Sequence, residues 1–209
     1  MRNSPPVVAK MNYSILFAKY PEIGRVKTRL ARGLGNEKSV QFYRQILKDI
    51  IHQTFPTQSQ YQNVLCYDPP ERGKEFKKSF PDFFAYWPQA SGNLGERMVA
   101  AFQKSFQAGA KKTVIIGSDC PELKEAALNE AFQLLETKDL VLGPARDGGY
   151  YLIGTREPFP LLFQEIPWST SGVFQETLKR AKKNHLSVGL LSERSDIDTY
   201  EDYLREYAP

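Results

Sequence analysis

Hydrophobic positions along the chain follow two alternating periods. Short runs rich in β-branched and aromatic residues alternate with longer stretches in which apolar residues recur every three or four positions. The short runs predict strands and the longer stretches predict helices. The predicted strands cover residues 13–18, 62–67, 83–87, 113–117, 139–143, 149–153 and 186–191. The predicted helices cover residues 36–54, 71–79, 95–108, 123–136, 171–184 and 199–207.

The apolar content of these elements indicates how they pack. Residues 113–117 and 139–143 are almost continuously apolar, which is typical of strands buried on both faces of a mainly parallel sheet. Residues 36–54 instead form one apolar face with charged residues opposite, as in a helix that covers such a sheet. The pattern therefore predicts a βαβ protein. In open sheets of this kind, ligands bind beyond the carboxyl ends of the strands, so loops that follow strands are the places to search.

Length and composition fit one globular domain. The chain has 209 residues, of which 41% are hydrophobic and 25% are charged, and it contains no internal repeat or low-complexity tract. We expect residues 1–11 to form a flexible leader and residues 12–209 to form a single domain.

Several features that the sequence lacks limit the cellular compartment and the kinds of partner that we expect for this protein. The two cysteines stand in unrelated contexts, which argues against a zinc site or a disulfide framework and favours a reducing compartment. No apolar run approaches the roughly 20 residues of a membrane span, and the first ten residues do not resemble a signal peptide. The net charge of +4 comes without the basic stripe of a nucleic-acid binder. We therefore expect a cytoplasmic protein with no membrane span and no nucleic-acid partner.

Charge is unevenly distributed along the chain. Residues 19–48 carry eight basic and two acidic side chains, whereas residues 193–206 carry six acidic and two basic ones. In the first loop, residues 19–31, a turn at Gly24 precedes Lys27 and Arg29. Cations this close together favour an anion such as phosphate as their guest, and glycine permits close approach of the backbone. The loop matches neither a Walker A motif nor a dinucleotide fingerprint, and a solvated basic turn remains an alternative.

Carboxylates follow three other predicted strands. Asp119 comes directly after the strand at 113–117 and could hold Mg²⁺ or Mn²⁺, although it or Ser118 could instead cap the next helix. Asp147 stands before two glycines, in a segment that could be a ligand-binding loop or only a hairpin turn.

The fourth loop, residues 196–202, carries the second candidate metal ligand. If its backbone is extended, Asp196 and Asp198 point to opposite faces, and Asp198 is then the second metal carboxylate. Thr199 and Asp202 fit the capping box of the last helix, so the acids could also serve only that helix start.

Six motifs in one order resemble a known family. They are KYPEIGRVKTRLA at 19–31, GNLGERM at 92–98, GSDCPEL at 117–123, GPARDGGYYLIG at 143–154, WST at 168–170 and DIDTYEDY at 196–203. Together they resemble the bacterial glycosyltransferase-like family associated with arsenosugar biosynthesis, within the nucleotide-diphospho-sugar transferase superfamily. The guanylyltransferases that act on phospholactate and on the molybdenum cofactor are similar more distantly. The resemblance implies a three-layer, Rossmann-like (GT-A) mainly parallel sheet flanked by helices on both faces.

The resemblance also implies roles for individual residues. Gly24, Lys27 and Arg29 would hold the nucleotide phosphates, and Gly95 and Arg97 would lie along the same pocket. Asp119 and Asp198 would hold a divalent cation, Mg²⁺ or Mn²⁺. Asp147 would activate the acceptor, and Trp168 would lie on the acceptor side. Asn93 stands where the family pattern has an aspartate, so a charge role there is not expected.

The reaction expected from this resemblance is metal-dependent transfer of a glycosyl group from a nucleotide-diphospho-sugar to a small-molecule acceptor. One alternative is a nucleotidyltransferase that joins NMP to a phosphorylated small molecule and releases pyrophosphate. A further alternative is a non-catalytic nucleotide-binding protein. The base, sugar, acceptor, stereochemical outcome and oligomeric state are not encoded in any motif that we recognise.

Overall fold

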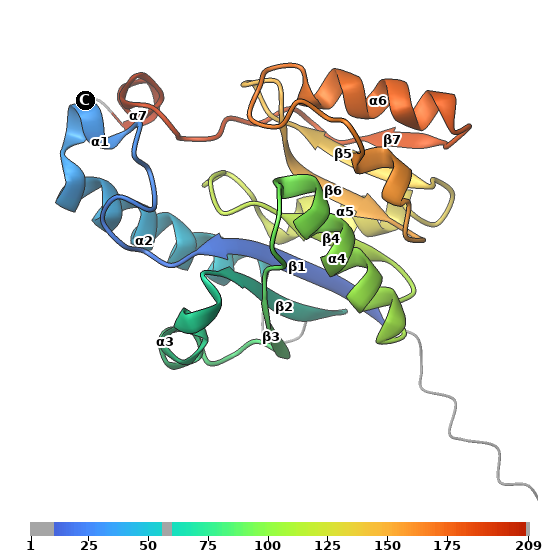
Figure 1. Ribbon diagram of the computed structural model, residues 1–209, viewed down its shortest axis with the longest axis horizontal. Helices are drawn as coiled ribbons and strands as arrows, with labels where there is room; N and C mark the ends of the chain where they lie inside the picture. Colours follow the sequence, from blue (N-terminus) through green and yellow to red (C-terminus); the bar gives the residue numbers. More distant parts are fainter. Residues whose placement is uncertain (1–10, 56–59, 208–209) are drawn as a thin grey trace, which may run out of the picture.

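The structure is a computed structural model that describes residues 11–55 and 60–207, and its centre is one mixed sheet (Figure 1). The strands are β1 (Asn12–Lys19), β2 (Tyr61–Asp68), β3 (Ala85–Pro88), β4 (Thr113–Ile116), β5 (Leu140–Pro144), β6 (Tyr150–Thr155) and β7 (Val188–Leu190). They form a seven-stranded sheet in the order β3-β2-β1-β4-β6-β5-β7. Strand β6 runs antiparallel to its neighbours β4 and β5, and the other pairings are parallel. The prediction of a mainly parallel sheet is confirmed.

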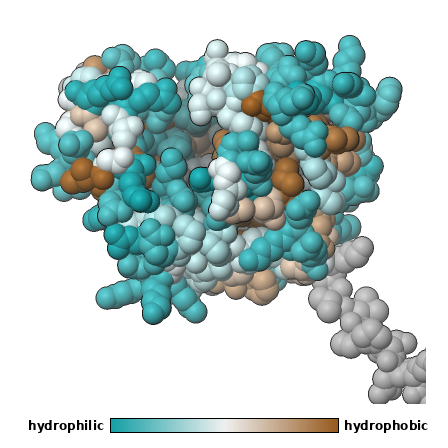
Figure 2. Space-filling view, in the orientation of Figure 1, coloured by the Kyte–Doolittle hydropathy of each residue, from teal (hydrophilic) through white to brown (hydrophobic). Residues whose placement is uncertain are grey.

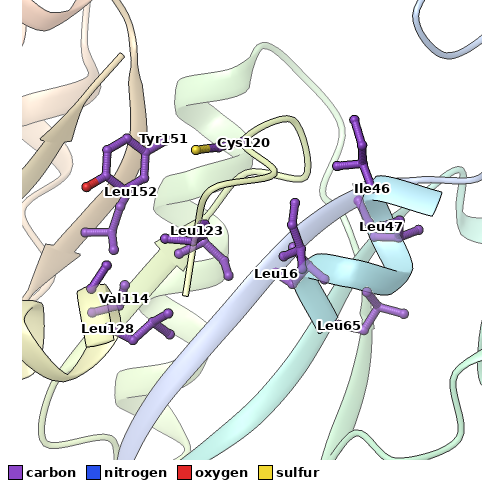
Figure 3. Close-up of a cluster of buried hydrophobic side chains, with 14 of the residues drawn as sticks. Leu16, Ile46, Leu47, Leu65, Val114, Cys120, Leu123, Leu128, Tyr151 and Leu152 are labelled. Carbon is purple, nitrogen blue, oxygen red and sulfur yellow. The ribbon is translucent and has the colours of Figure 1, made fainter. Parts of the chain in front are cut away.

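Helices cover both faces of this sheet. They are α1 (Ala31–Leu34), α2 (Asn36–Thr54), α3 (Gly73–Ser79), α4 (Leu94–Gln107), α5 (Glu125–Leu134), α6 (Val173–Lys183) and α7 (Tyr200–Tyr207), with 3-10 turns η1 (Pro70–Arg72) and η2 (Pro160–Phe163). One apolar cluster joins the sheet to α2 and α5, and a second joins the opposite face to α4, η2 and α6. In Figure 3, Leu16 of β1 and Leu65 of β2 lie beside Ile46 and Leu47 of α2. The predicted three-layer fold class is therefore confirmed.

The predicted elements agree with the structure except at some ends. The predicted helix at 36–54 matches α2, whereas α5 and α6 each begin two residues later than predicted. The one-turn helix α1 and the turn η2 are too short to show a period, and the sequence did not predict them. Residues 1–10 of the predicted leader lie outside the described residues, so that prediction stays open.

The topology brings the loops that carry the candidate site residues to one edge of the sheet, the edge formed by the carboxyl ends of the parallel strands. Strands β1 and β4 are parallel, so the loops that follow them leave at the same edge. Because β6 is antiparallel to both β4 and β5, the β5–β6 hairpin tip lies at that edge too. Strand β7 is parallel to β5, so the segment leading to α7 also begins there. The four loops are therefore neighbours in space.

Candidate functional site

A cleft of about 890 Å³ lies along this edge. Its walls come from the ends of β1 and β4, the β5–β6 hairpin, the start of α4, the segment before α6 and the segment before α7. Figure 2 shows the surface hollowed between these parts of the molecule. Of the predicted site residues, Arg29, Arg97, Asp119, Asp147, Trp168 and Asp198 line the cleft. Gly24, Lys27 and Gly95 do not belong to its lining.

Lys27 lies beneath the cleft as a buried cation. Its side chain is only 1% exposed, and its Nζ lies 2.5 Å from Asp119 Oδ1 and 4.0 Å from Asp198 Oδ1. The same Nζ donates a hydrogen bond to the carbonyl of Ile197. A buried ammonium requires such partners, because an unpaired charge is costly to remove from water. One lysine thus joins the first loop to the loop after β4 and to the segment before α7.

Arg29 and Gly24 occupy more open positions of the first loop. The Arg29 side chain is 61% exposed, and its guanidinium forms an ion pair with Asp198. Gly24 is exposed with φ +79°, a left-handed conformation that favours glycine, and an added Cβ would meet nothing within 4 Å. Gly24 therefore shapes the turn at a distance from the cleft lining, while Arg29 reaches the cleft itself.

The helix-cap alternative for Ser118 and Asp119 is wrong. Helix α5 begins at Glu125 with Lys124 as its N-cap, and Lys124 makes no side-chain cap bond. Ser118 Oγ instead lies 2.9 Å from the hydroxyl of Tyr43, and Asp119 is paired with Lys27. The carbonyl of Asp119 accepts a hydrogen bond from Ile197 N at 3.0 Å. Asp119 is thus fixed by its backbone, while its side chain is 46% exposed toward the cleft.

The prediction that only Asp198 faces the site is also wrong, because Asp196 lines the cleft as well. Residues 195–199 form no regular strand, so side chains do not alternate between two faces there. The Oδ1 atom of Asp196 is buried and has no hydrogen-bond partner. Burial, followed by the charges of Asp119 and Asp147, raises the pKa of Asp196 to about 7. The sequence offered no signal for this, because it depends on which loops meet.

The acids at the start of α7 behave as the capping box predicts. Asp202 N donates to Thr199 Oγ1 at 3.2 Å, and Thr199 N donates to Asp202 Oδ2 at 2.9 Å. Asp202 is therefore committed to the helix start. Asp198, by contrast, directs its side chain to Arg29 and Lys27.

The hairpin alternative for Asp147 is confirmed, yet the residue also lines the cleft. The Oδ1 atom of Asp147 accepts a hydrogen bond from Gly149 N at 2.9 Å, and the side chain stays exposed. Gly148 has φ +88°, and an added Cβ would lie 2.0 Å from the carbonyl oxygen of Ser171. Only glycine permits this close approach, which fixes the hairpin tip against the segment before α6.

The start of α4 brings Arg97 to the cleft, whereas Gly95 lies outside the cleft lining. Asn93 is the N-cap of α4 and forms a capping box with Glu96, a pattern that the sequence Asn-x-x-Glu could have revealed. Gly95 is buried beneath the indole of Trp168, so it packs against that side chain and does not face the cleft directly. Arg97 donates from Nε to Gly92 O at 2.9 Å and from Nη1 to Gln89 Oε1 at 3.3 Å.

Two negative findings concern the described part of the chain only. Among residues 11–55 and 60–207, no three His, Cys, Asp or Glu side chains gather closely enough to form a ready-made metal site. None of the helices in those ranges has the length and apolar content that crossing a membrane requires.

These features define a Rossmann-like α/β fold of the kind found in nucleotidyltransferases. The chain belongs to the family described as "Uncharacterized protein conserved in bacteria (DUF2064)", whose pattern matches residues 51–170. It is also similar to a protein of Desulfovibrio desulfuricans G20 to which a nucleotide-diphospho-sugar transferase function is assigned provisionally. The two are 34% identical over 95% of this chain and 87% of that chain, with a TM-score of 0.89.

More distant structures share the fold alone. One is the 4-diphosphocytidyl-2C-methyl-D-erythritol synthase of Anaerococcus prevotii DSM 20548, at 11% identity over 94% of this chain and 96% of that chain, with a TM-score of 0.58. Another is Rv0371c of Mycobacterium tuberculosis H37Rv in complex with manganese, at 16% identity over 95% and 98% of the two chains, with a TM-score of 0.55. No curated protein matches the sequence significantly.

Proposed function

We propose that this protein binds a nucleotide-diphospho-sugar together with a divalent cation and transfers the glycosyl group to a small-molecule acceptor. The observation that carries the proposal is the meeting of opposite charges in one cleft. Lys27 and Arg29 come from the first loop and contact Asp119 and Asp198, which stand about 90 and 170 positions later in the chain. A diphosphate requires positive charge, and a divalent cation bound beside it would require carboxylates of its own, so both sets of side chains are needed together.

The carboxylates fit a divalent cation on the geometry of the site. Asp119 and Asp198 already enclose a positive charge, the ammonium of Lys27, and Asp196 adds a buried carboxylate oxygen without a partner. Mg²⁺ is commonly held by one or two carboxylates, with phosphate oxygens and water completing the set, so a preformed cluster of three is not required. We propose Asp119 and Asp198 as the ligands, with Asp196 beside them. When bound, the cation supplies positive charge that stabilises a departing diphosphate.

The basic residues and the acceptor side complete the proposal. Arg29 binds the diphosphate from the wall of the cleft, and Arg97 lies along the same cleft. Lys27, buried beneath that wall, holds Asp119 and Asp198 and adds positive charge from below. Asp147, exposed at the hairpin tip, accepts the proton of the acceptor hydroxyl. Trp168 also lines the cleft, and we place it where the sugar of the donor meets the acceptor. The single domain over residues 12–209, the cytoplasmic location and the association with arsenosugar biosynthesis stay predictions.

The nearest alternative, nucleotidyl transfer, uses the same groups. It is favoured by the fold, which this chain shares along 94% of its length with a solved structure described as a nucleotidyl transferase. The products separate the two reactions, because glycosyl transfer releases a nucleoside diphosphate and nucleotidyl transfer releases pyrophosphate. Incubation with nucleotide-sugars or NTPs and candidate acceptors, followed by phosphate-product analysis, decides between them. Tight nucleotide binding with neither product would favour the non-catalytic alternative.

Asp119→Asn tests the metal ligand directly. We expect it to abolish most of the gain in UDP or GDP affinity that Mn²⁺ produces, because an amide is a weaker ligand of hard cations than a carboxylate. Calorimetric titration with and without Mn²⁺ measures this gain. Asp49→Asn, which removes a carboxylate on α2 that accepts a bond from Gln45, is the control and should leave the gain unchanged. An intact gain in Asp119→Asn would remove this residue from the metal site.

A further inference from the structure

Trp168 is held as a fixed aromatic wall of the cleft. Its indole packs parallel to the ring of Phe163, with 6.5 Å between ring centroids and 17° between planes. Phe163 in turn packs against Phe102 of α4, with 5.9 Å between their ring centroids. The wall is therefore anchored in the apolar cluster on that face of the sheet. Trp168 is only partly buried, and its remaining surface lines the cleft.

The position of the indole depends on the absence of a side chain at residue 95. A Cβ added to Gly95 would lie 2.5 Å from Cζ2, 2.8 Å from Cε2 and 2.9 Å from Nε1 of Trp168. Contacts this short do not occur, so any larger residue must displace the indole. The backbone of Gly95 is ordinary helix near the start of α4, which explains why conformational freedom is not the reason for glycine here.

We infer that Trp168 is a specificity-determining wall for the sugar ring of the nucleotide-diphospho-sugar, and that Gly95 is the residue that positions it. The inference rests on the proposed function, since it assigns one part of the same cleft. An indole face offers a broad apolar surface against which the C–H face of a sugar can pack.

The surroundings of Trp168 favour a sugar ring over a nucleobase. Ser169 and Ser171 line the cleft next to it, and Asp147 lies in the same lining, so hydroxyl and carboxylate oxygens are available to hydroxyl groups. The order of the strands places Asp119, after β4, between the end of β1 and the β5–β6 hairpin. A diphosphate held at Asp119 therefore separates a ligand's two ends, and the end on the hairpin side meets Asp147.

The test uses five proteins: the wild type, Gly95→Ala, Trp168→Ala, the double variant and the control Gly172→Ala. Alanine favours helix more than glycine does, so Gly95→Ala is expected to fold, and thermal unfolding checks this. Gly172→Ala is the matched control, because its φ is −92° and its nearest neighbour, Thr170 Oγ1, would lie 3.7 Å from the new Cβ. The ligands are UDP, GDP, UDP-glucose, UDP-N-acetylglucosamine and GDP-mannose, titrated with Mn²⁺.

We expect the wild type to bind at least one nucleotide-sugar more tightly than it binds the corresponding nucleoside diphosphate. In Gly95→Ala this sugar-dependent gain falls about fivefold, while the affinity for the diphosphate stays within about twofold. In the Trp168→Ala background, Gly95→Ala changes neither affinity, because its effect acts through the indole. The chain has two tryptophans, so subtracting the spectrum of the matching Trp168→Ala protein isolates the Trp168 emission, which Gly95→Ala shifts even without ligand.

Other results overturn the inference. It fails alone if the diphosphates bind but no sugar adds affinity, or if Gly95→Ala weakens diphosphates and nucleotide-sugars equally. It also fails if Gly95→Ala leaves the Trp168 emission unchanged, or if it keeps its full effect in the Trp168→Ala background. If none of the five ligands binds the wild type, the proposed function fails and the sugar assignment fails with it.

Discussion

Lys27→Met is expected to destabilise the metal-free protein by about 3 kcal/mol, and Mn²⁺ is expected to restore much of that loss. Methionine keeps the length of the lysine stem but removes the buried ammonium that lies 2.5 Å from Asp119 and 4.0 Å from Asp198. Asp119 then loses its neutralising charge, and Asp198 keeps only its ion pair with Arg29. If they are metal ligands, a divalent cation can take the place of the ammonium.

The chain offers a matched control in Lys112. Its side chain is 3% exposed against 1% for Lys27, it pairs with an exposed acid, Glu136, and its Nζ also donates to a backbone carbonyl, that of Phe132 at 3.1 Å. Lys112, however, lies before β4, at the end of the sheet opposite the cleft. Lys112→Met should therefore lose stability by a similar mechanism, without any gain in its response to Mn²⁺ over that of the wild type.

Thermal unfolding in EDTA and in Mn²⁺ measures both variants. A loss of about 3 kcal/mol corresponds to a fall in Tm of roughly 6–12 °C for a chain of this size. The difference in Tm between Mn²⁺ and EDTA should be larger for Lys27→Met than for the wild type, whereas for Lys112→Met it should equal that of the wild type. An equal response of the two variants to Mn²⁺ would mean that the carboxylates around Lys27 do not form the metal site.

The sequence predicted the fold well because its periods are local. Continuous apolar runs at 113–117 and 139–143 require burial on both faces, and the structure places β4 and β5 inside the sheet. The capping box at Thr199 and Asp202 could be predicted for the same reason, since both partners lie within four residues.

The candidate site was predicted less completely because it depends on contacts between distant loops. Lys27 was expected to face a phosphate, but its partners Asp119 and Ile197 can only be identified once the loops are assembled. Asp196 was assigned to the wrong face because an extended backbone was assumed where the chain is irregular. Gly95 was assigned to the nucleotide, because the sequence does not show that Trp168 covers it.

Asp196→Asn is expected to make the metal-free protein more stable, the opposite of what a buried structural carboxylate would do. Burial and the neighbouring charges of Asp119 and Asp147 raise the pKa of Asp196 to about 7, from an ordinary value of 3.8. A carboxyl group whose pKa is raised by folding favours the folded state only while it is protonated. Its contribution is fully present below pH 3.8 and is lost as the pH rises through 7.

The advantage of Asp196→Asn should therefore grow with pH and then level off. It should be small near pH 4, increase up to about pH 7 and stay constant above it, with an upper limit of about 4 kcal/mol from a shift of this size. Urea unfolding in EDTA between pH 4 and pH 8.5 measures the difference from the wild type. Asp198→Asn is the control, because its carboxylate is ion-paired with Arg29, so its removal should not stabilise the protein at any pH.

A destabilised Asp196→Asn at pH 8 would show that this carboxylate has a favourable partner in the free protein. Stabilisation would instead mean that the protein keeps an unpaired negative charge in the cleft at the expense of its own stability, as expected of a residue beside a cation site.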